Sequence, residues 1–348
     1  MNIKYQDKYM RRCFDLARLG AGFVSPNPMV GAVIVYNDEI IGEGWHQMYG
    51  TAHAEVNAVN SVAEENVQYL SKSTIYVSLE PCCIFGKTPP CSNLIIEKKI
   101  PEVVISCLDS TPEVAGNSVK ILEAAGVKVT TGVLEKEGLA LAAIRNTFAG
   151  ENRPYIILKY AQSADGFISK KGEQTWLTNA YSKRLTHKWR AETDAILVGT
   201  NTAAIDNPQL NNRYWSGMPP LRLAIDKSMK LDQNLHLFDD EQPTLILTES
   251  AVNIMGFERT QFIQLDFSEN LPQQIVQTLA QGKISSLLIE GGAHTLQSFI
   301  DADLWDEARI FSVDKRLGEG VKAPQIKGEI VKIEKIVADK LTVVKRQD

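Results

Sequence analysis

The chain has 348 residues, a length that favours two domains over one. Hydrophobic residues make up 44% of it and charged residues 23%, which is a globular composition. The formal net charge of -5 supplies no basic field of the kind that draws proteins to nucleic acid, so we expect no nucleic-acid partner.

The amino-terminal sequence carries charged residues and no long apolar run after them, so it does not have the form of a secretory signal peptide. Elsewhere no stretch approaches the roughly 18 uncharged apolar residues of a membrane span. These features predict a soluble, cytoplasmic protein without a membrane partner.

The first 150 residues alternate helix and strand, which predicts a three-layer α/β domain. Two apolar runs flank Asn37-Asp38 and are expected to form a hairpin. The elements expected in this half are a helix at 7–20, hairpin strands at 30–36 and 40–45, a helix at 53–65, a strand at 75–79, a helix at 91–99, a strand at 103–107, a helix near 117–125, a strand at 127–131 and a helix at 134–148.

The segment from Ala149 to Pro154 interrupts this periodicity with glycine, polar residues and proline. We place a domain boundary there, with a first domain at 1–148 and a second at 152–348. The clearest strands of the second half are expected at 155–160, 195–199, 221–226, 244–248 and 286–290, alternating with helices.

The cysteines are unevenly distributed, because three of the five lie within ten consecutive positions. An odd number in a chain without a leader argues against a disulfide framework and favours metal binding or catalysis. The five are Cys13, Cys82, Cys83, Cys91 and Cys107.

A histidine and two of these cysteines lie where expected strands end or expected helices begin. His53 would begin one helix, Cys82 would follow strand 75–79, and Cys91 follows two prolines that suit another helix start. Zn²⁺ prefers imidazole nitrogen and thiolate sulfur in a tetrahedron, and three protein ligands leave the fourth position for water. We therefore expect His53, Cys82 and Cys91 to bind a catalytic Zn²⁺.

Glu55 indicates which reaction this site would catalyse. Zinc-dependent base deaminases combine H-x-E with P-C-x-x-C, and their glutamate is an acid and base rather than a ligand. Zinc lowers the pKa of its water from about 15.7 to about 7, and the glutamate moves the protons. Glu55 is therefore the expected catalytic residue.

Other interpretations fit the same histidine and cysteines. Eight residues separate Cys82 from Cys91, a longer spacing than P-C-x-x-C, and Cys83 is a nearer alternative ligand. Adjacent residues, however, seldom bind one metal. The cysteines could also be core residues, or the metal could be structural, although a structural zinc normally takes four protein ligands and would not need Glu55.

The residues around these ligands resemble a known family. The segments His53-Ala54-Glu55, Pro81 to Cys91 and Pro26 to Gly31 are similar to the deaminase domain of the bifunctional riboflavin-biosynthesis enzymes, which belong to the cytidine-deaminase-like superfamily. The Gly-Lys-Thr-Pro-Pro-Cys stretch is far more specific than H-x-E alone. The resemblance implies a three-layer α/β/α fold for this half.

The same resemblance implies three substrate contacts. It nominates Asn27 for the pyrimidine, His46 for the substrate, and Lys87 for the substrate phosphate, a role that suits a lysine point charge. The alternatives are an ordinary strand-end histidine and a solvated loop lysine. Ile84 stands where the family usually has a substrate-contacting histidine, so one polar contact is missing or comes from elsewhere.

Residues 154–345 resemble the reductase half of the same family, whose fold is like that of dihydrofolate reductase. The similar segments are Lys159 to Gly166, Trp176 to Thr178, Arg190-Ala191, Asp194 to Gly199, Thr202, Asp206 to Leu210 and Glu290 to Gly292. The last segment also has a physical argument, because a strand followed by two glycines and a helix can bind a phosphate. Alone, the two glycines would more often be a tight turn.

The resemblance implies the ligands of this half. NADPH is expected near Ala161, Trp176, Thr202, Asp206, Gly291, Gly292, Ala293, His294, Thr295, Leu296, Gln297 and Ser298. Substrate is expected near Arg190, Leu210, Arg213 and Glu290. The two arginines suit a phosphate, with surface salt bridges as the alternative. Gln174 carries less weight, and His187 and His294 are expected to be structural or solvent-facing.

The implied first reaction is hydrolytic deamination of 2,5-diamino-6-(5-phosphoribosylamino)pyrimidin-4(3H)-one. The second is NADPH reduction of the ribosyl side chain, giving 5-amino-6-(5-phosphoribitylamino)uracil. Two rivals are a nucleic-acid base deaminase with an accessory domain and a non-catalytic zinc module. The family also implies a homo-oligomer, either a dimer or a tetramer.

Overall fold

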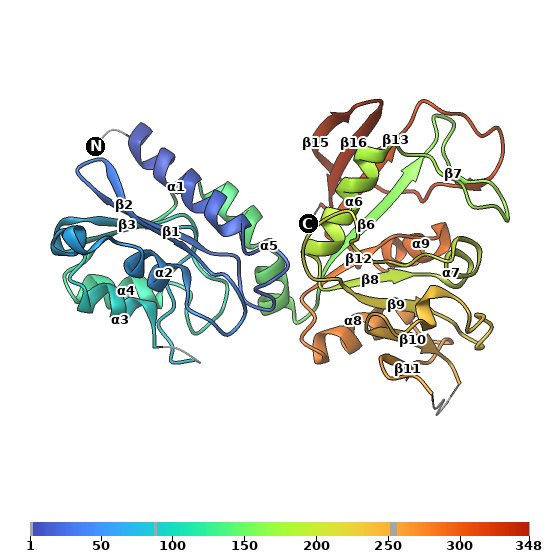
Figure 1. The fold of residues 1–348 in the computed structure, drawn as a ribbon, viewed down its shortest axis with the longest axis horizontal. Helices are drawn as coiled ribbons and strands as arrows, with labels where there is room; N and C mark the ends of the chain where they lie inside the picture. Colours follow the sequence, from blue (N-terminus) through green and yellow to red (C-terminus); the bar gives the residue numbers. More distant parts are fainter. Residues whose placement is uncertain (1–2, 87–88, 251–255, 348) are drawn as a thin grey trace. The chain divides into compact units, whose positions relative to one another are not determined.

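The computed structural model describes residues 3–86, 89–250 and 256–347. The chain forms two compact units, Met1–Asn152 and Arg153–Asp348, and Figure 1 traces each of them from its first element to its last.

The first unit is built on a five-stranded sheet in the order β2-β1-β3-β4-β5. Its strands are β1 (Gly31–Tyr36), β2 (Glu39–Trp45), β3 (Thr74–Val77), β4 (Glu102–Ile105) and β5 (Lys128–Thr130). β1 pairs antiparallel with β2 and β3, and β4 pairs parallel with β3 and β5. The predicted hairpin is confirmed: Asn37 and Asp38 have φ of 50° and 63°, which suits a tight turn between twisted strands.

Helices cover both faces of this sheet (Figure 1). α1 (Ile3–Arg18) packs through Tyr9, Met10 and Phe14 against Val33 and Val35 of β1. The alternate β1 residues, Ala32 and Ile34, face a second cluster. That cluster is supplied by α2 (Ala54–Asn60), α3 (Cys91–Glu97) and α4 (Asn117–Ala124). Alternate side chains of β1 therefore pack against helices on opposite faces of the sheet. This arrangement confirms the expected three-layer domain.

Several predicted helix ends of this unit differ from the structure. α1 begins at Ile3 rather than at residue 7 and ends at Arg18 rather than at residue 20, and α3 ends at Glu97 rather than at residue 99. The helix expected at 53–65 stops at Asn60, and a separate 3-10 helix, η1 (Glu64–Lys72), follows. The Ser61 hydroxyl donates to the Ala58 carbonyl and accepts from the Glu43 amide, so its local hydrogen bonds compete with the helix. The last helix, α5 (Glu135–Glu151), runs three residues past its predicted end and closes on Asn152 in the left-handed conformation.

The second unit is built on a nine-stranded sheet in the order β11-β10-β9-β8-β12-β6-β13-β16-β15. Its strands are β6 (Tyr155–Gln162), β8 (Ala195–Val198), β9 (Leu221–Ile225), β10 (Thr244–Thr248), β11 (Thr260–Gln264), β12 (Ser286–Ile289), β13 (Glu307–Ser312), β15 (Glu329–Ile336) and β16 (Asp339–Lys345). A separate two-stranded sheet joins β7 (Phe167–Ser169) to β14 (Val321–Lys322). All five strands predicted in this half are confirmed within two residues of their ends.

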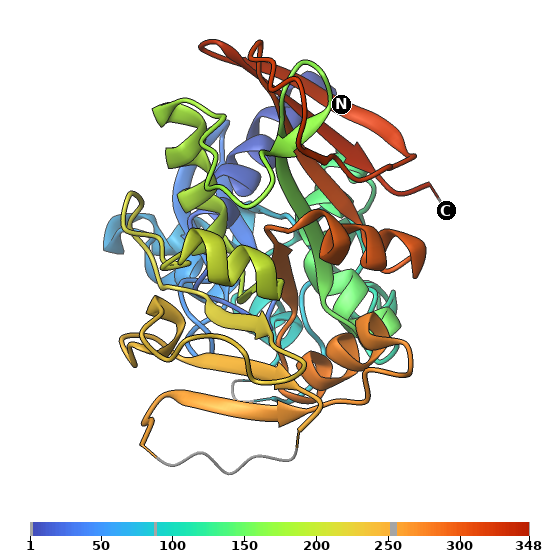
Figure 2. The ribbon, with the colours of Figure 1, turned by 90° about the vertical axis from the view of Figure 1, so that its right-hand side faces the viewer.

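The pairings from β11 through β13 are parallel, so the carboxyl ends of these strands share one edge of the sheet. The helices are α6 (Ala180–Glu192), α7 (Thr200–Asp206), α8 (Leu271–Gln281) and α9 (Ala293–Asp301), with a 3-10 turn η2 (His236–Phe238). Figure 2 shows these helices around the central strands. In open α/β sheets, ligands bind at the carboxyl edge, which places the candidate reductase site there.

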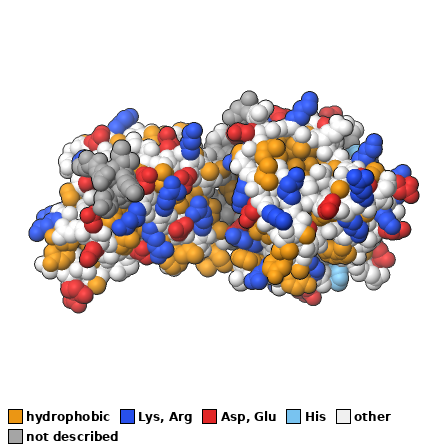
Figure 3. Space-filling model, turned by 90° about the horizontal axis from the view of Figure 1, so that it is seen from above, with side chains coloured by type: hydrophobic (Ala, Val, Ile, Leu, Met, Phe, Trp, Pro, Cys, Tyr) orange, Lys and Arg blue, Asp and Glu red, His pale blue; other side chains and the backbone are white. Residues whose placement is uncertain are grey.

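Two surface properties bear on partners. None of the helices in the described ranges combines the length and apolar character that a bilayer crossing requires. On the face seen in Figure 3, acidic and basic side chains are interspersed, and neither sign forms a continuous field.

The start of the second unit is fixed by a buried ion pair. The Arg153 guanidinium donates to both Asp306 carboxylate oxygens at 2.7 Å each. Asp306 also accepts the Ile156 amide at 2.7 Å. Both side chains are about nine-tenths buried, so the pair fastens the beginning of β6 to the turn before β13.

We expect Asp306→Asn to lower the free energy of unfolding of the second unit by about 3 kcal/mol, because it removes the charge from a buried carboxylate that accepts two hydrogen bonds from Arg153 and one from the Ile156 amide. Asp303→Asn is the matched control, since Asp303 pairs with Arg346 at an exposed position and should cost under about 0.5 kcal/mol. Urea unfolding curves of the two variants test this, and equal losses would contradict it.

Candidate functional site

The first unit brings three predicted ligands together. His53 is the residue before α2, Cys82 lies in the loop after β3, and Cys91 begins α3. Their ligand atoms all lie within 4.8 Å of one another. His53 Nδ1 is 3.5 Å from Cys82 Sγ and 3.4 Å from Cys91 Sγ. One imidazole and two sulfurs, supplied by three segments, are a donor set that fits zinc.

The neighbouring Cys83 points elsewhere. Its thiol donates to the Glu113 carbonyl at 3.6 Å, and it is not part of the ligand group. Of the two ligand sets considered from sequence, the geometry therefore favours the one with Cys91.

The electrostatics of this group favour a thiolate at Cys82. A hydrogen bond from the Cys91 thiol, helped by His53 and by the Cys91 amide, lowers the pKa of Cys82 to about 4 against the opposing effect of burial. The hydrogen bond to Cys82 raises the pKa of His53. Since the thiolate is the form that binds metals, the protein already provides one ligand in its binding state.

Glu55 lies in the first turn of α2 and is buried, only 3% exposed. Burial, and secondly the nearby Cys82 charge, raise its pKa. Its oxygens are outside the ligand group. A buried carboxyl with a raised pKa beside a metal group is suited to accepting and returning a proton.

Asn27 and His46, two of the predicted substrate contacts, form one hydrogen-bonded unit. The Asn27 amide nitrogen is 3.1 Å from His46 Nε2, and His46 Nδ1 is 3.1 Å from the Ala52 carbonyl. Burial lowers the pKa of His46, which favours the neutral ring. In that form Nδ1 donates to Ala52 and Nε2 accepts from Asn27, which orients the amide. The His46 ring lies 5.4 Å from the His53 ring, so the unit adjoins the ligand group.

The prediction for Lys87 lies outside the described residues. Ile84, which stands in place of the family histidine, is 46% exposed.

Sequence reasoning missed Glu80, the residue before Pro81. Its buried carboxylate accepts the amides of Asp109, Gly116 and Ser118 at 3.2, 2.9 and 3.2 Å. Glu80 therefore fastens the loop after β4 to the segment that carries Cys82. An acidic residue directly after a buried strand was the available signal, because such a residue needs partners.

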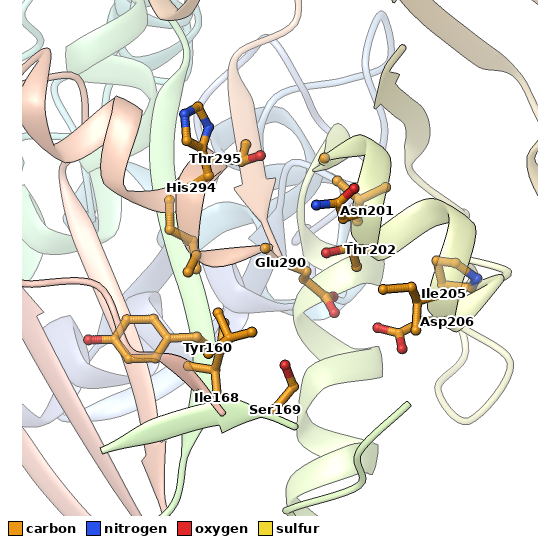
Figure 4. A pocket seen from close by; sticks show the side chains of 18 of the residues that line it. Tyr160, Ile168, Ser169, Asn201, Thr202, Ile205, Asp206, Glu290, His294 and Thr295 are labelled. Atoms are coloured by element: carbon orange, nitrogen blue, oxygen red, sulfur yellow. The ribbon is translucent and has the colours of Figure 1, made fainter. Parts of the chain in front are cut away.

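In the second unit, a cavity of about 1500 Å³ opens at the carboxyl edge of the sheet. Figure 4 shows Glu290 between Thr202 and Asp206 of α7 on one side and Tyr160 and Ile168 on the other. All the predicted cofactor and substrate residues of this half line the cavity except Gln297. The Gln297 side chain instead donates to Asp301 and accepts the Gln325 amide.

The two glycines after β12 allow a close approach of backbone to this cavity. Gly291 has a φ of 121°, which favours glycine. A Cβ on Gly292 would lie 3.1 Å from the Thr202 hydroxyl. Gly292 caps α9, whose first residues line the cavity, and a helix start with free amides is suited to a phosphate.

Glu290 is buried and held by two cations. Its oxygens accept Arg190 Nε at 2.6 Å and the second Arg190 nitrogen at 2.8 Å, and Lys159 Nζ lies 3.7 Å away. Burial alone would raise the pKa of Glu290, but the charges of Arg190 and Lys159 outweigh it and hold that pKa at about 2. Arg190 also donates to the Asn211 carbonyl at 2.9 Å. Lys159 was missed from sequence, although a lysine inside an apolar strand was a usable signal.

The comparisons with known proteins agree with both halves. Residues 3–107 match the model of the cytidine and deoxycytidylate deaminase zinc-binding region, and residues 154–343 match that of the RibD C-terminal domain. The chain is 38% identical over 344 residues to the riboflavin biosynthesis protein RibD of Actinobacillus pleuropneumoniae, covering 96% of this chain and 90% of that protein.

The chain belongs to the RibD family. It is 35% identical to the RibD of Aquifex aeolicus, covering 92% of this chain and 90% of that protein. The structure of the diaminohydroxyphosphoribosylaminopyrimidine deaminase/5-amino-6-(5-phosphoribosylamino)uracil reductase of Thermotoga maritima superimposes with a TM-score of 0.91 at 33% identity, over all of both chains. Acinetobacter baumannii RibD gives 0.87 at 28% identity, also over all of both chains.

Membership confirms the sequence interpretation of fold and function. The protein is a bifunctional enzyme of riboflavin biosynthesis, with a zinc deaminase domain and a reductase domain. It is thus both a hydrolase and an oxidoreductase.

We expect Cys91→Ser to lower the zinc content of the purified protein at least ~10-fold, because it removes one of the three predicted thiolate or imidazole ligands. Cys83→Ser is the matched control, since its thiol is directed at the Glu113 carbonyl. Metal analysis of both variants, with reductase turnover as a folding check, provides the measurement. Zinc retained by Cys91→Ser and lost by Cys83→Ser would reverse the ligand assignment.

Proposed function

We propose that the first unit deaminates 2,5-diamino-6-(5-phosphoribosylamino)pyrimidin-4(3H)-one and that the second unit reduces the ribosyl side chain of the product with NADPH. One observation carries this proposal: a His53–Cys82–Cys91 group lies beside the buried, non-ligating Glu55 in a chain that also holds a reductase cavity. The name of the Thermotoga maritima relative describes the same pair of activities.

In the deaminase unit, His53, Cys82 and Cys91 would hold Zn²⁺, which supplies the acidity that makes water a nucleophile at neutral pH. Glu55 would accept a proton as water attacks the amine-bearing ring carbon. It would then protonate the ring nitrogen and the departing amine, so that the products are the uracil derivative and ammonia. The raised pKa of Glu55 suits both directions of this transfer.

The Asn27–His46 unit would orient the pyrimidine in that reaction. The amide nitrogen of Asn27 is committed to His46, so its carbonyl oxygen would be the group offered to the ring. The proposed role of Lys87, binding the phosphate, rests on the family resemblance alone.

In the reductase unit, the glycine turn and the start of α9 would hold the phosphates of NADPH, with Ala161, Trp176, Thr202 and Asp206 along the same cavity. Glu290, Leu210, Arg213 and Arg190 would surround the ribosyl group. NADPH, when bound, would supply the hydride that reduces C1 of the ribose, and these residues would position the two reactants.

We expect Glu55→Gln to lower deaminase kcat at least ~10²-fold, because the amide can neither accept nor return a proton. Zinc content and NADPH oxidation with the deaminated substrate should stay at wild-type levels. Glu102→Gln, a change at a partly exposed residue paired with Lys128, should leave ammonia release intact. Unaltered ammonia release by Glu55→Gln would refute the mechanism, and release from RNA rather than the nucleotide would refute the substrate.

We propose also that two copies of the chain associate through β15, the last strand of the nine-stranded sheet (Figures 1 and 2). Ile330, Val331 and Ile333 are exposed on this free edge, which invites pairing with another strand. An antiparallel pairing centred on Ile333 would place Lys332 opposite Glu334 of the second copy. The strand is therefore complementary to itself in charge, as a two-fold interface requires.

We expect Ile333→Lys to convert an oligomer into monomers in analytical ultracentrifugation, because each interface would bury two unpaired charges. Lys335→Arg keeps the charge on the same strand and should leave the sedimentation coefficient unchanged. A wild-type chain that sediments as a monomer at micromolar concentration would refute association through β15.

A further inference from the structure

The chain around Cys82 leaves the first sheet at the end of β3. β3 ends at Val77, and Cys82 lies beyond it in the following loop. Loop backbones move more than the strands that they follow. A metal site, by contrast, needs its ligand atoms held within about 0.5 Å of their places. The chain around Cys82 must therefore be held by contacts outside the strand.

Glu80 makes such contacts. Its side chain is buried, and its Oε2 accepts the amides of Gly116 and Asp109 at 2.9 and 3.2 Å. Its Oε1 accepts the Ser118 amide at 3.2 Å. Both oxygens are thus bonded to the 109–118 segment, which runs from the loop after β4 into α4. Hydrogen bonds to a charged acceptor are roughly twice as strong as neutral ones, so this attachment is firm.

The start of α4 explains why the 109–118 segment takes an acceptor from another part of the chain. The residue before α4 is Gly116, whose φ of 72° is left-handed and which has no side chain to cap the helix. The first amides of a helix lack partners within it, and the positive end of the helix dipole favours an anion there. Glu80 meets both requirements, so α4 and Glu80 hold each other in place.

The 109–118 segment is in turn fixed to α5. Arg145 donates to the Thr111 hydroxyl at 3.0 Å, and the Ser110 hydroxyl donates to the Asn146 side chain at 3.0 Å. These bonds attach the segment to two successive residues of α5. Glu80 therefore binds to a part of the first unit that is itself anchored.

Further contacts hold the chain on the other side of Glu80. The Cys82 carbonyl accepts the Ser92 amide of α3 at 3.1 Å. The Cys83 thiol donates to the Glu113 carbonyl of the 109–118 segment at 3.6 Å, but a thiol is a weak donor. Of these two connections to the 109–118 segment, the charge-assisted bonds of Glu80 are therefore the stronger.

We propose that Glu80 is a positioning residue for the deaminase: by bonding to the 109–118 segment it sets where the sulfur of Cys82 lies, and so controls how tightly the first unit holds Zn²⁺. This inference rests on the ligand set of the proposed function. Glu80 is not in the ligand group, so its effect must pass through the backbone of Pro81 and Cys82. Replacing residues that orient metal ligands typically lowers metal affinity about 10- to 100-fold.

The test is Glu80→Gln in the full chain loaded with Zn²⁺. The substitution replaces one acceptor oxygen by an NH2 group, which would face either the Ser118 amide or the other two amides, donor against donor. We expect Zn²⁺ to leave at least ~10-fold faster when a chromogenic chelator is added in excess. Glu113→Gln is the matched control, because it makes the same change at an exposed residue of the same segment. It should release Zn²⁺ at the wild-type rate.

A second measurement separates positioning from stability. Co²⁺ in place of Zn²⁺ absorbs visible light, and its bands respond to the geometry of the sulfur and nitrogen ligands. We expect Glu80→Gln to shift those bands and Glu113→Gln to leave them unchanged. Urea unfolding of the same proteins measures stability. A Glu80→Gln protein that is less stable, yet has the wild-type cobalt spectrum and zinc release, would show that Glu80 only caps α4 and would overturn the proposal.

Where Glu80→Gln does not fold, Glu80→Asp decides. It keeps both oxygens and the charge, but its side chain is shorter by one methylene group, so it reaches the same amides only if the chain around Cys82 moves. We expect Zn²⁺ to leave faster than from wild type. A release rate equal to that of wild type would overturn the proposal.

Ammonia release distinguishes failure of this inference from failure of the proposed function. A wild-type protein whose Zn²⁺ release depends on Glu80, yet which frees no ammonia from the pyrimidine nucleotide, would uphold the role of Glu80 and refute the deamination. Zn²⁺ release that is the same in wild type and Glu80→Gln would refute the role of Glu80, even in an active deaminase.

Discussion

A carboxylate removed from water must be given charges or hydrogen bonds in return, and both halves of this enzyme are organised by that requirement. Glu80 accepts three backbone amides and so joins the loop after β4 to the segment of Cys82. Glu290 accepts Arg190 and faces Lys159, and so joins β12, α6 and β6 at the floor of the cavity. Removing the partners of either carboxylate would leave a buried charge unpaired, and an unpaired buried charge destabilises the fold.

Glu55 is the contrasting case. It is as deeply buried as Glu80, and burial raises its pKa, whereas two cations hold the pKa of Glu290 at about 2. A carboxylate whose oxygens are all paired with donors or cations stabilises the structure around it. A carboxyl group whose protonated and ionised forms are closer in energy can accept and release a proton. The same side chain therefore has different uses according to its partners: Glu80 and Glu290 connect segments, and Glu55 is available for chemistry.

Local patterns in the sequence predicted much of the fold and the composition of the sites. The Asn37-Asp38 turn, the apolar strands and the glycines after β12 all depend on near neighbours, and so they could be read from the chain. The break after Asn60 could not, since it depends on a contact between Ser61 and Glu43. Edge strands such as β15 were missed because their polar and apolar residues do not separate into two faces.

In the sites, too, features set by local sequence were predicted and features set by long-range contacts were not. Residue types and spacing nominated His53, Glu55, Cys82 and Cys91, and the structure places these four close together. Long-range partnerships were invisible: the sequence nominated Arg190 for a phosphate, whereas the folded protein commits its donors to Glu290, a hundred residues away. Lys183 lines the same cavity but was not nominated from the sequence, because its position there depends on which face of α6 is turned toward the cavity.

The strand order of the second unit has a consequence for synthesis on the ribosome. The first sheet has all its strands by Thr130, so the deaminase core can close early. β6, by contrast, emerges first in its unit, and its partners among the described strands of the sheet are β12 and β13, through matches such as Tyr155 with Ser286 and Ile157 with Glu307. This central strand therefore has no partner strand, and its apolar faces stay exposed, until almost the whole polypeptide has been synthesised. Such distant pairings make folding slow, and they expose the nascent reductase to aggregation after the deaminase core has already formed.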